Sequence, residues 1–149
     1  MKIQDLFRED SKHISKWEEN YTDEEFYAFN RAIRIKLDAL LYGNKRLSPK
    51  ELWMSAMVYH HGFTLSSSRK ALRLAEQAYE RSYKPAKTLI AQATDRLLQL
   101  EKKPQKFGTQ VVKLRNGKLK MYKIDGTVTD KQRKEYGLPS LEKLKAYLN

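Results

Sequence analysis

The 149-residue chain carries 30 lysines and arginines against 18 aspartates and glutamates, a net charge of +12, and 40% of its residues are hydrophobic. These values fit one compact domain with a real core, and no apolar run approaches the roughly 18 residues of a transmembrane helix. The absence of cysteines excludes disulfides, thiol catalysis and cysteine-based zinc sites, and the N-terminus lacks the apolar segment of a secretory signal, so we expect a cytoplasmic protein.

The positive charge is spread unevenly along the chain. Residues 1–30 contain four basic and eight acidic side chains, whereas residues 31–100 and residues 101–149 each contain thirteen basic and five acidic ones. A surface this basic attracts phosphate-rich or acidic partners and speeds their encounter, although charge also serves solubility alone. The composition therefore favours an anionic ligand, a nucleic acid or an acidic protein as partner, and no membrane.

Two helices are predicted in the first third of the chain. Thr22 and Glu25 form a capping box before residues 23–42, where apolar residues recur at helical spacing until Gly43. A shorter helix is expected over residues 2–18. The apolar residues of the two segments are Ile3, Leu6, Phe7, Ile14 and Trp17, then Phe26, Phe29, Ile33, Leu37, Leu40 and Leu41.

Three helices are predicted in the middle of the chain. The segment SPKE at residues 48–51 marks the start of the first, which Gly62 ends. Serines 66–68 are expected to cap the second, and Pro85 starts the third. Alanines on the apolar faces predict close helix packing. This pattern resembles Sel1-like and tetratricopeptide-type helical hairpins, but a repeat array needs several units and only about one is visible.

The polarity pattern changes after Pro104. The segment TQVVKLRNGKLKMYKID alternates in polarity, and Asn116-Gly117 is typical of a two-residue hairpin turn. We therefore expect a hairpin near residues 110–124. Such a loop pairs Arg115 with Lys118, Leu114 with Leu119, Lys113 with Lys120 and Val112 with Met121, so that Val112, Leu114, Leu119 and Met121 share one face.

A short helical tail is predicted after the hairpin. Thr129 or Asp130 starts one helix that Gly137 ends, and Ser140 caps the last helix. The fold expected is α+β and mostly helical, in one domain over residues 1–149. Its parts are an N-terminal helical part (1–50), a helical hairpin body (51–103), and the β-hairpin with C-terminal helices (104–149).

The polar face of the hairpin is the clearest electrostatic feature. Like charges directly opposite each other cost roughly a few tenths of a kcal/mol per pair, so folding alone does not favour them. One interpretation is a ribbon that contacts nucleic-acid phosphates, with a tyrosine on which a base stacks. The other is a solvated face, or a strand edge kept positive against aggregation. The candidate nucleic-acid-binding residues are Lys113, Arg115, Lys118, Lys120 and Tyr122.

A second polar group surrounds the loop PQKFGTQ at residues 104–110. Arg96 can hold a phosphate or carboxylate by two parallel hydrogen bonds. Asp95 can accept from backbone N–H groups of the turn at residues 107–109, or act as a general base. Gln105 and Gln110 orient a ligand or satisfy backbone groups. These residues form either a ligand or catalytic site, or a structural elbow that pins the loop to the helix.

This arrangement resembles the signature of an uncharacterised bacterial domain family. Its members carry an Asp-Arg pair on a helix, then a "pQ-x-aromatic-GTQ" element, and near the C-terminus an Arg followed by "GLPsL". The family usually has Tyr at the position of Phe107. The resemblance covers roughly residues 51–145 and implies a fold and candidate residues but no reaction. The matching positions are Asp95, Arg96, Pro104, Gln105, Phe107, Gly108, Thr109, Gln110, Asp130, Arg133, Gly137, Leu138, Pro139 and Leu141.

The histidines and known catalytic motifs add little. His60 and His61 are adjacent, so they cannot both bind one metal as an i, i+4 pair does. Serines 66–68 fit a helix cap better than a nucleophile. The chain has no GxGxxG, Walker loop, GxSxG or HExxH motif, and neither a metal site nor a cofactor is predicted.

Two functions of different classes follow. In the first, a small enzyme or ligand-binding domain takes a phosphate-bearing substrate, and Asp95 or His61 handles the proton. The residues predicted to bind and orient that substrate are Arg96, Gln105, Thr109, Gln110 and Arg133. In the second, a non-catalytic module binds nucleic acid or an acidic protein through the hairpin. A concave pocket at the PQKFGTQ loop favours the first function, and a filled interior counts against it.

Overall fold

A computed structural model describes residues 1–16, 21–43 and 46–148. Within these ranges the fold is mostly helical α+β, as predicted, with seven helices and one two-stranded antiparallel hairpin. None of the described helices is both long and apolar enough to cross a bilayer. The elements are α1 (Ile3–Ile14), α3 (Asp23–Gly43), α4 (Pro49–His60), α5 (Leu65–Glu80), α6 (Ala86–Leu100), β1 (Val111–Lys113), β2 (Leu119–Met121), α7 (Asp130–Glu135) and α8 (Leu141–Ala146).

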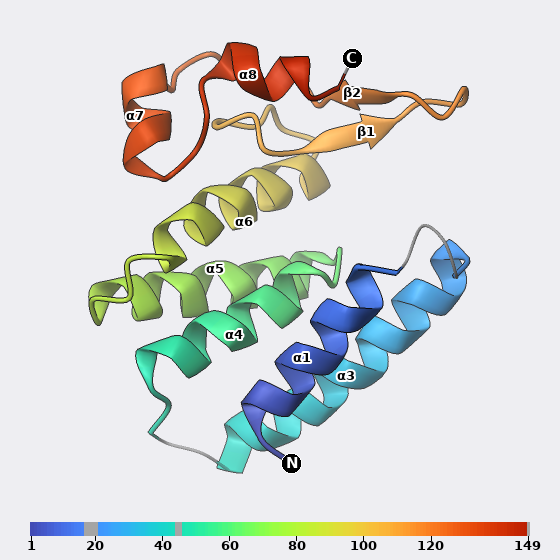
Figure 1. Cartoon of the computed structure of the whole chain (residues 1–149), viewed down its shortest axis with the longest axis vertical. Helices are drawn as coiled ribbons and strands as arrows, with labels where there is room; N and C mark the ends of the chain where they lie inside the picture. The colour runs from blue at the N-terminus through green and yellow to red at the C-terminus, as the bar shows by residue number, and fades with distance from the viewer. Residues whose placement is uncertain (17–20, 44–45, 149) are drawn as a thin grey trace.

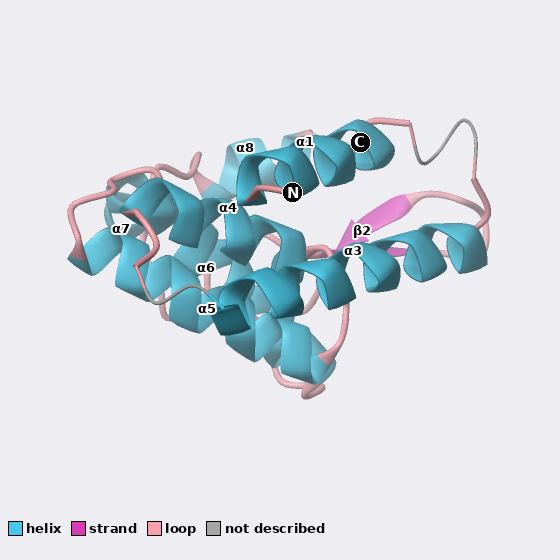
Figure 2. Cartoon of the chain, turned by 90° about the horizontal axis from the view of Figure 1, so that it is seen from below, coloured by secondary structure: helices cyan, strands magenta, loops and turns pink. Residues whose placement is uncertain are grey.

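The helices are stacked, and the hairpin lies at one end of the stack. Helices α1 and α3 pack against each other and against α4, α4 packs against α5, and α5 packs against α6 (Figure 1). The hairpin follows the C-terminal end of α6 and projects over the N-terminal end of α3. In Figure 2, seen from below, the magenta strands overlap the middle of α3 in projection. Residues of the hairpin, drawn in orange in Figure 1, and of the start of α3 line one cleft.

The predicted capping boxes begin α3 and α4. The Glu25 N–H donates to Oγ1 of Thr22 at 3.2 Å, and the Thr22 N–H donates to the Glu25 carboxylate at 2.8 Å. Ser48 and Glu51 make the same reciprocal pair, at 3.2 and 2.9 Å. Each box satisfies N–H groups that have no partner within the helix, which is why these sequence positions fix the helix starts.

The first helix is shorter than predicted. It begins after Lys2, whose backbone N–H donates to the Asp5 carboxylate at 3.0 Å, and it ends at Ile14. The predicted segment ran on to residue 18. Its last two positions, including Trp17, lie outside the described residues.

The cap of α5 is Thr64, so the prediction that serines 66–68 cap this helix is wrong. Thr64 has an extended backbone, and its Oγ1 accepts from the Ser67 N–H at 3.1 Å. Ser67 lies inside the first turn, where its Oγ accepts from the Thr64 N–H at 3.2 Å. The helix therefore begins directly after Thr64, because the Thr64 hydroxyl can accept from the N–H of Ser67 in the first turn.

Small side chains let α4, α5 and α6 approach closely, as the alanine pattern predicted. Ala56, Ala71, Ala75, Ala78 and Ala93 are completely buried where these helices meet. Close approach of this kind gives the dense packing of a protein interior. The larger buried side chains of the same core include Ile3, Leu6, Ile33, Leu37, Leu52, Val58, Tyr59, Leu74 and Leu89.

The hairpin forms where predicted, but its pairing register is shifted by one residue. The observed pairs are Val111 with Met121, Val112 with Lys120, and Lys113 with Leu119. The loop contains three residues instead of two, because Gly117 alone adopts a positive φ (82°), whereas a two-residue turn of the Asn-Gly type needs positive φ at both positions. The Leu114 N–H donates to the Lys118 carbonyl at 2.8 Å and closes this loop.

The shifted register changes which side chains share a face. The predicted pairs of like charges, Arg115 with Lys118 and Lys113 with Lys120, are wrong. Side chains of paired residues point to the same side of a hairpin, and so do residues two apart. One face therefore carries Val111, Lys113, Leu119 and Met121 together, and the opposite face carries Val112 and Lys120.

The helical tail agrees with its prediction. Thr129 caps α7, its Oγ1 accepting from the Gln132 N–H at 3.2 Å, and Ser140 caps α8 by accepting from the Lys143 N–H at 3.3 Å. Thr88 of α6 donates its hydroxyl hydrogen to the carbonyl of Tyr136 at 2.7 Å. The tail is thus fastened to the helical body as well as to the hairpin.

Replacing Thr64 by Ala tests the corrected cap. The substitution removes the hydroxyl that accepts from the Ser67 N–H, so we expect it to lower the free energy of unfolding by about 1 kcal/mol. The measurement is urea denaturation followed by circular dichroism. Ser66→Ala is the matched control and should change stability by less than about 0.5 kcal/mol, since Ser66 is exposed. A larger loss of unfolding free energy in Ser66→Ala than in Thr64→Ala would show that a serine caps the helix after all.

Candidate anion-binding cleft

Asp95 is the centre of the elbow that joins α6 to the hairpin. Its side chain is completely buried; Oδ1 accepts from the N–H groups of Lys106 (2.8 Å) and Phe107 (3.0 Å), and Oδ2 accepts from the N–H (3.0 Å) and Oγ1 (2.8 Å) of Thr109. Gly108, at φ 86°, makes the tight turn that points these groups at one carboxylate. Asp95 therefore anchors the loop to the helix.

Gln105 connects the two chain segments that flank the elbow. It is completely buried, and its Nε2 donates to the carbonyls of Gln110 (3.0 Å) and Tyr122 (2.8 Å) while its Oε1 accepts from the Gln110 N–H (2.8 Å). Its backbone N–H donates to the Lys123 carbonyl at 2.9 Å, and its carbonyl accepts from the Asp125 N–H at 2.9 Å. Both hydrogens and the oxygen of its side-chain amide are used inside the fold.

Arg133 reaches the same loop from α7. Its Nε donates to the Phe107 carbonyl at 2.9 Å, and its Nη1 donates to Oδ1 of Asp130 at 3.1 Å. The same Asp130 oxygen accepts from the Leu141 N–H at 2.9 Å, so this ion pair also fixes the start of α8. Nη2 of Arg133 is buried and has no hydrogen-bond partner among the described residues. Arg133 thus lies in the interior.

The residues around PQKFGTQ converge, but mainly on one another and on the loop backbone. Asp95, Gln105, Thr109 and Arg133 use their polar atoms to hold the turn, in a nearly filled interior. This geometry supports the elbow interpretation for these four residues. Roles for them in catalysis or in holding a ligand stay predictions.

Arg96 differs from the rest of the group because part of it lines a cleft between the hairpin and the N-terminal end of α3. Its Nε donates to Oε1 of Gln110 (2.5 Å), its Nη1 donates to the His60 carbonyl (2.9 Å), and its guanidinium carbon lies 3.8 Å from the centre of the Phe63 ring. The residue is only 9% exposed and lines the cleft. Its Nη2 has no hydrogen-bond partner among the described residues, yet unlike that of Arg133 it is not enclosed.

The charge of Arg96 is not balanced by a carboxylate. Both hydrogen-bond acceptors are neutral oxygens, and in the described part of the chain no acidic side chain lies within ion-pair distance of the guanidinium. Burial lowers the pKa of Arg96 to about 10. Burial, and then the charge of Arg96, hold the pKa of the neighbouring His60 well below its usual 6.5. A buried cation without a counter-ion is costly, and an anion bound beside it would offset that cost.

The cleft beside Arg96 lies between the hairpin and the N-terminal end of α3. It has a volume of about 760 Å³, and its described lining residues supply two cations, one carboxylate and two aromatic rings. Three of its hairpin residues share the face that the three-residue loop creates. The lining residues are Tyr21, Asp23, Phe63, Arg96, Val111, Lys113, Gly117 and Leu119.

The other predicted nucleic-acid-binding residues are distributed around the hairpin. Arg115, Lys118 and Lys120 are exposed, and none of them forms an ion pair with another described residue. Lys120 and Tyr122 line a separate groove with Lys145 of α8. The structure therefore places Lys113 in the Arg96 cleft and Tyr122 elsewhere.

His61 pairs with Asp10, a residue that no sequence pattern indicated. Nδ1 of His61 lies 2.6 Å from Oδ2 of the buried Asp10, whose Oδ1 accepts from Nδ2 of Asn30 at 3.1 Å. Arg34 completes the network by donating its Nε hydrogen to Oδ1 of Asn30 at 2.8 Å. The carboxylate can orient the imidazole ring through Nδ1, and a role of His61 in proton transfer stays a prediction. Asp95 belongs to the elbow, so the two residues predicted to handle a proton lie in separate networks.

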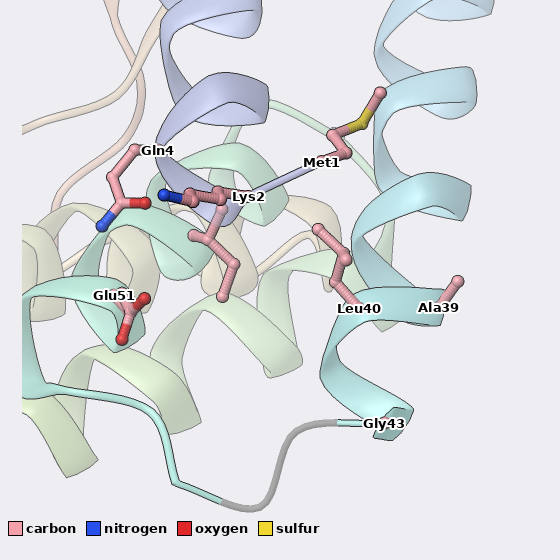
Figure 3. A pocket seen from close by; sticks show the side chains of 8 residues that line it. Met1, Lys2, Gln4, Ala39, Leu40, Gly43 and Glu51 are labelled. Atoms are coloured by element: carbon pink, nitrogen blue, oxygen red, sulfur yellow. The ribbon is translucent and has the colours of Figure 1, made fainter.

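A second pocket lies between the start of α1 and the end of α3 (Figure 3). Its volume is about 690 Å³. Figure 3 shows Gln4 and Glu51 on one side and Met1, Leu40 and Ala39 on the other. The described lining includes Lys2 and Glu51, which form no ion pair with each other, and none of the predicted site residues.

No family model, no curated protein and no solved structure matches the chain. The resemblances to the bacterial family and to Sel1-like hairpins therefore stay predictions, and the site is interpreted from its own geometry. Over the described ranges, no group of three His, Asp or Glu side chains is placed to hold a metal ion.

Replacing Asp95 by Asn tests the elbow. The change puts an NH₂ group against donors that now point at a carboxylate, and we expect a loss of about 2–4 kcal/mol in unfolding free energy. Amide hydrogen exchange at Lys106, Phe107 and Thr109 should accelerate. The matched control is Asp125→Asn, because Asp125 also accepts a backbone N–H, from Thr127, but in an exposed turn. An equally small loss of unfolding free energy in both variants would contradict the anchoring role of Asp95.

The buried His60 makes stability depend on pH. Above pH 6.5 its ring is neutral in both states, but below that value the unfolded chain takes up a proton that the folded His60 resists. The free energy of unfolding should therefore fall on acidification, by up to about 1 kcal/mol per pH unit, until the folded-state pKa is reached. Urea denaturation between pH 7.5 and 5 measures this slope.

His60→Gln provides the control for this pH dependence. The variant should show a shallower slope than the wild-type chain, while the contribution of His13, whose pKa burial also lowers, persists in both. Parallel slopes in the two proteins would show that His60 does not resist protonation in the fold.

Proposed function

We propose that the chain binds a phosphate-bearing ligand in the cleft between the hairpin and α3, with Arg96 as the principal anion-binding residue. The observation that carries this proposal is an arginine that is nine-tenths buried. Its guanidinium is fixed through two nitrogens by neutral oxygens, and its third nitrogen has no hydrogen-bond partner among the described residues. A group held in this way has little conformational entropy to lose when an anion binds, so its remaining hydrogens are preorganised donors.

Lys113, on the hairpin, supplies a second positive charge to the lining of the cleft. It is exposed and forms no ion pair with a described residue, and Val111 and Leu119 flank it on the same hairpin face. An anion between Arg96 and Lys113 would contact one desolvated cation and one hydrated cation. The buried one contributes most of the affinity, since charge-assisted hydrogen bonds strengthen away from water.

The elbow has a positioning role in this proposal. Asp95 holds the turn at residues 106–109, the turn places Gln110, and Gln110 fixes Nε of Arg96. Nε2 of Gln110 donates to Oγ1 of Thr109 at 3.1 Å, which keeps the amide in the orientation that presents its oxygen to Arg96. Asp95 thus holds the loop in place, and the loop in turn orients the neighbouring Arg96.

The proposal is a binding function, without a reaction step. Asp95 already accepts four hydrogen bonds and has no access to solvent, which does not suit a general base. His61 can be oriented by Asp10, but its network with Asp10 and Asn30 contains no nucleophile.

A second candidate function is the binding of nucleic acid or an acidic protein by the hairpin alone. It is supported by the exposure of Lys113, Arg115, Lys118 and Lys120, which are not neutralised by described acidic side chains. The three-residue loop separates these charges instead of stacking them in pairs, which reduces the electrostatic reason to regard them as functional. We therefore rank this function second.

Replacing Arg96 by Gln tests the proposed function. Two-dimensional ¹H–¹⁵N NMR would follow titration with sodium pyrophosphate against sodium chloride at matched ionic strength. We expect saturable shifts at the Arg96 Nε–H and at the amides of Phe63 and Val111, and a Kd at least about tenfold higher in the variant, because a charge-assisted hydrogen bond is lost.

Lys131→Gln is the charge-matched control for this titration. It removes the same single positive charge from an exposed position on α7, so it should leave the pyrophosphate affinity within about twofold of wild type. Equal weakening by both variants, or shifts spread evenly over the basic surface, would show that only net charge matters and would refute a site at Arg96.

A further inference from the structure

We propose that the ligand of the cleft is an unpaired nucleotide within a single-stranded nucleic acid. This inference rests on the proposed anion-binding function and names the class of ligand for the same site. It is drawn from three features of the cleft that phosphate alone does not explain: a carboxylate beside the cations, two aromatic side chains, and further cations beyond the rim.

The carboxylate of Asp23 lines the same cleft as Arg96 and Lys113. It would repel a longer ligand that carries negative charge along its whole length, such as an acidic peptide. A nucleotide carries its negative charge at one end and, on most bases, N–H or NH₂ donors at the other. The phosphate then binds Arg96 and Lys113, and the base donates to Asp23, which is an acceptor only.

The aromatic side chains provide a surface for the base. Tyr21 is 38% exposed, and its ring packs against His13 with 4.2 Å between ring centroids, which fixes the ring on one side. Phe63 contacts the guanidinium of Arg96 over its ring and meets Tyr27 in a T-shaped contact, with 5.9 Å between the ring centroids. A base that stacks on such supported rings gains affinity in any sequence context, because every base has a π-face.

The size of the cleft also fits a nucleotide. Its volume of about 760 Å³ far exceeds the need of a single phosphate and falls within the roughly 300–1,000 Å³ of small-molecule pockets. Val111 and Leu119, both partly exposed, add apolar surface to its lining.

A polymer is favoured over a free nucleotide because positive charge continues past the cleft. Arg115 and Lys118 lie at and next to the hairpin turn, and both are exposed without an ion-pair partner in the described ranges. Phosphates on either side of the bound nucleotide would contact them. A duplex is excluded from this mode, since its bases reach a pocket only after unpairing and unstacking.

The experiment is fluorescence anisotropy with the full chain. The probes are labelled single-stranded RNA and DNA of about 12 nucleotides and the matched duplexes, in about 50 mM salt where phosphate contacts are strong. Adenosine monophosphate and pyrophosphate serve as competitors, and poly-glutamate represents an acidic protein. We expect each single strand to bind at least about tenfold more tightly than its duplex and than adenosine monophosphate. The RNA and DNA arms identify the source of the nucleotide.

Variants at Tyr21 separate stacking from charge. Tyr21→Leu should weaken single-strand binding about fivefold or more but leave the pyrophosphate affinity unchanged, whereas Tyr21→Phe retains the ring and should bind like wild type. Reversal of Lys113, Arg115, Lys118 and Lys120 to Glu should abolish salt-sensitive binding of the single strand.

The outcomes distinguish the inference from the function on which it rests. If pyrophosphate binds through Arg96 but single strands and duplexes bind equally, or Tyr21→Leu has no effect, the nucleotide inference is overturned and the anion site stands. Tight binding of poly-glutamate at the same residues would also overturn it, in favour of an acidic protein. If neither pyrophosphate nor any oligonucleotide perturbs Arg96, both proposals fail.

Discussion

The carboxylate of Asp95 is the constraint on which the C-terminal half of the structure depends. It is buried among four donors from one turn, and a charged acceptor in that position can be satisfied only if the turn keeps its shape. This turn also fixes the point at which the hairpin leaves the helical body, and it positions the side-chain amide of Gln110, which orients Arg96. This one set of hydrogen bonds therefore determines both the path of the chain and the direction of the Arg96 guanidinium.

The sequence predicted the elements well because helix ends are decided locally. Thr22, Ser48, Thr129 and Ser140 cap helices as expected, since a hydroxyl three residues before an N–H is a short-range signal. The prediction of the α5 cap failed because Thr64 and serines 66–68 are all hydroxyl residues within five positions. Only the backbone geometry shows that Thr64 is the cap. The hairpin register failed because Asn-Gly permits more than one loop length, and only the backbone angles of the folded loop, where Gly117 but not Asn116 has a positive φ, decide between them.

The site was harder to predict than the fold because it depends on which polar groups are not already hydrogen-bonded within the fold. Sequence brought Asp95, Arg96, Gln105 and Gln110 into one hypothesis, and the structure does bring them together. Whether a side chain is consumed by the fold or available to a ligand follows from distances of a few ångströms, as the different surroundings of Arg96 and Arg133 demonstrate. Tyr21, Asp23 and Phe63 carry no motif, and they join the cleft only through the path of the chain.

The tight fastening of the hairpin has a kinetic consequence. The elbow hydrogen bonds tie the loop to α6, and the contact with Thr88 ties the tail to α6. The bridge through Gln105 joins the loop to the residue after β2, so the cleft is already formed in the chain without a ligand. A preformed site needs no loop closure, and association then depends on diffusional encounter, which the net charge of +12 accelerates at low salt. Differences in affinity among ligands of equal charge would consequently arise in how slowly each one leaves.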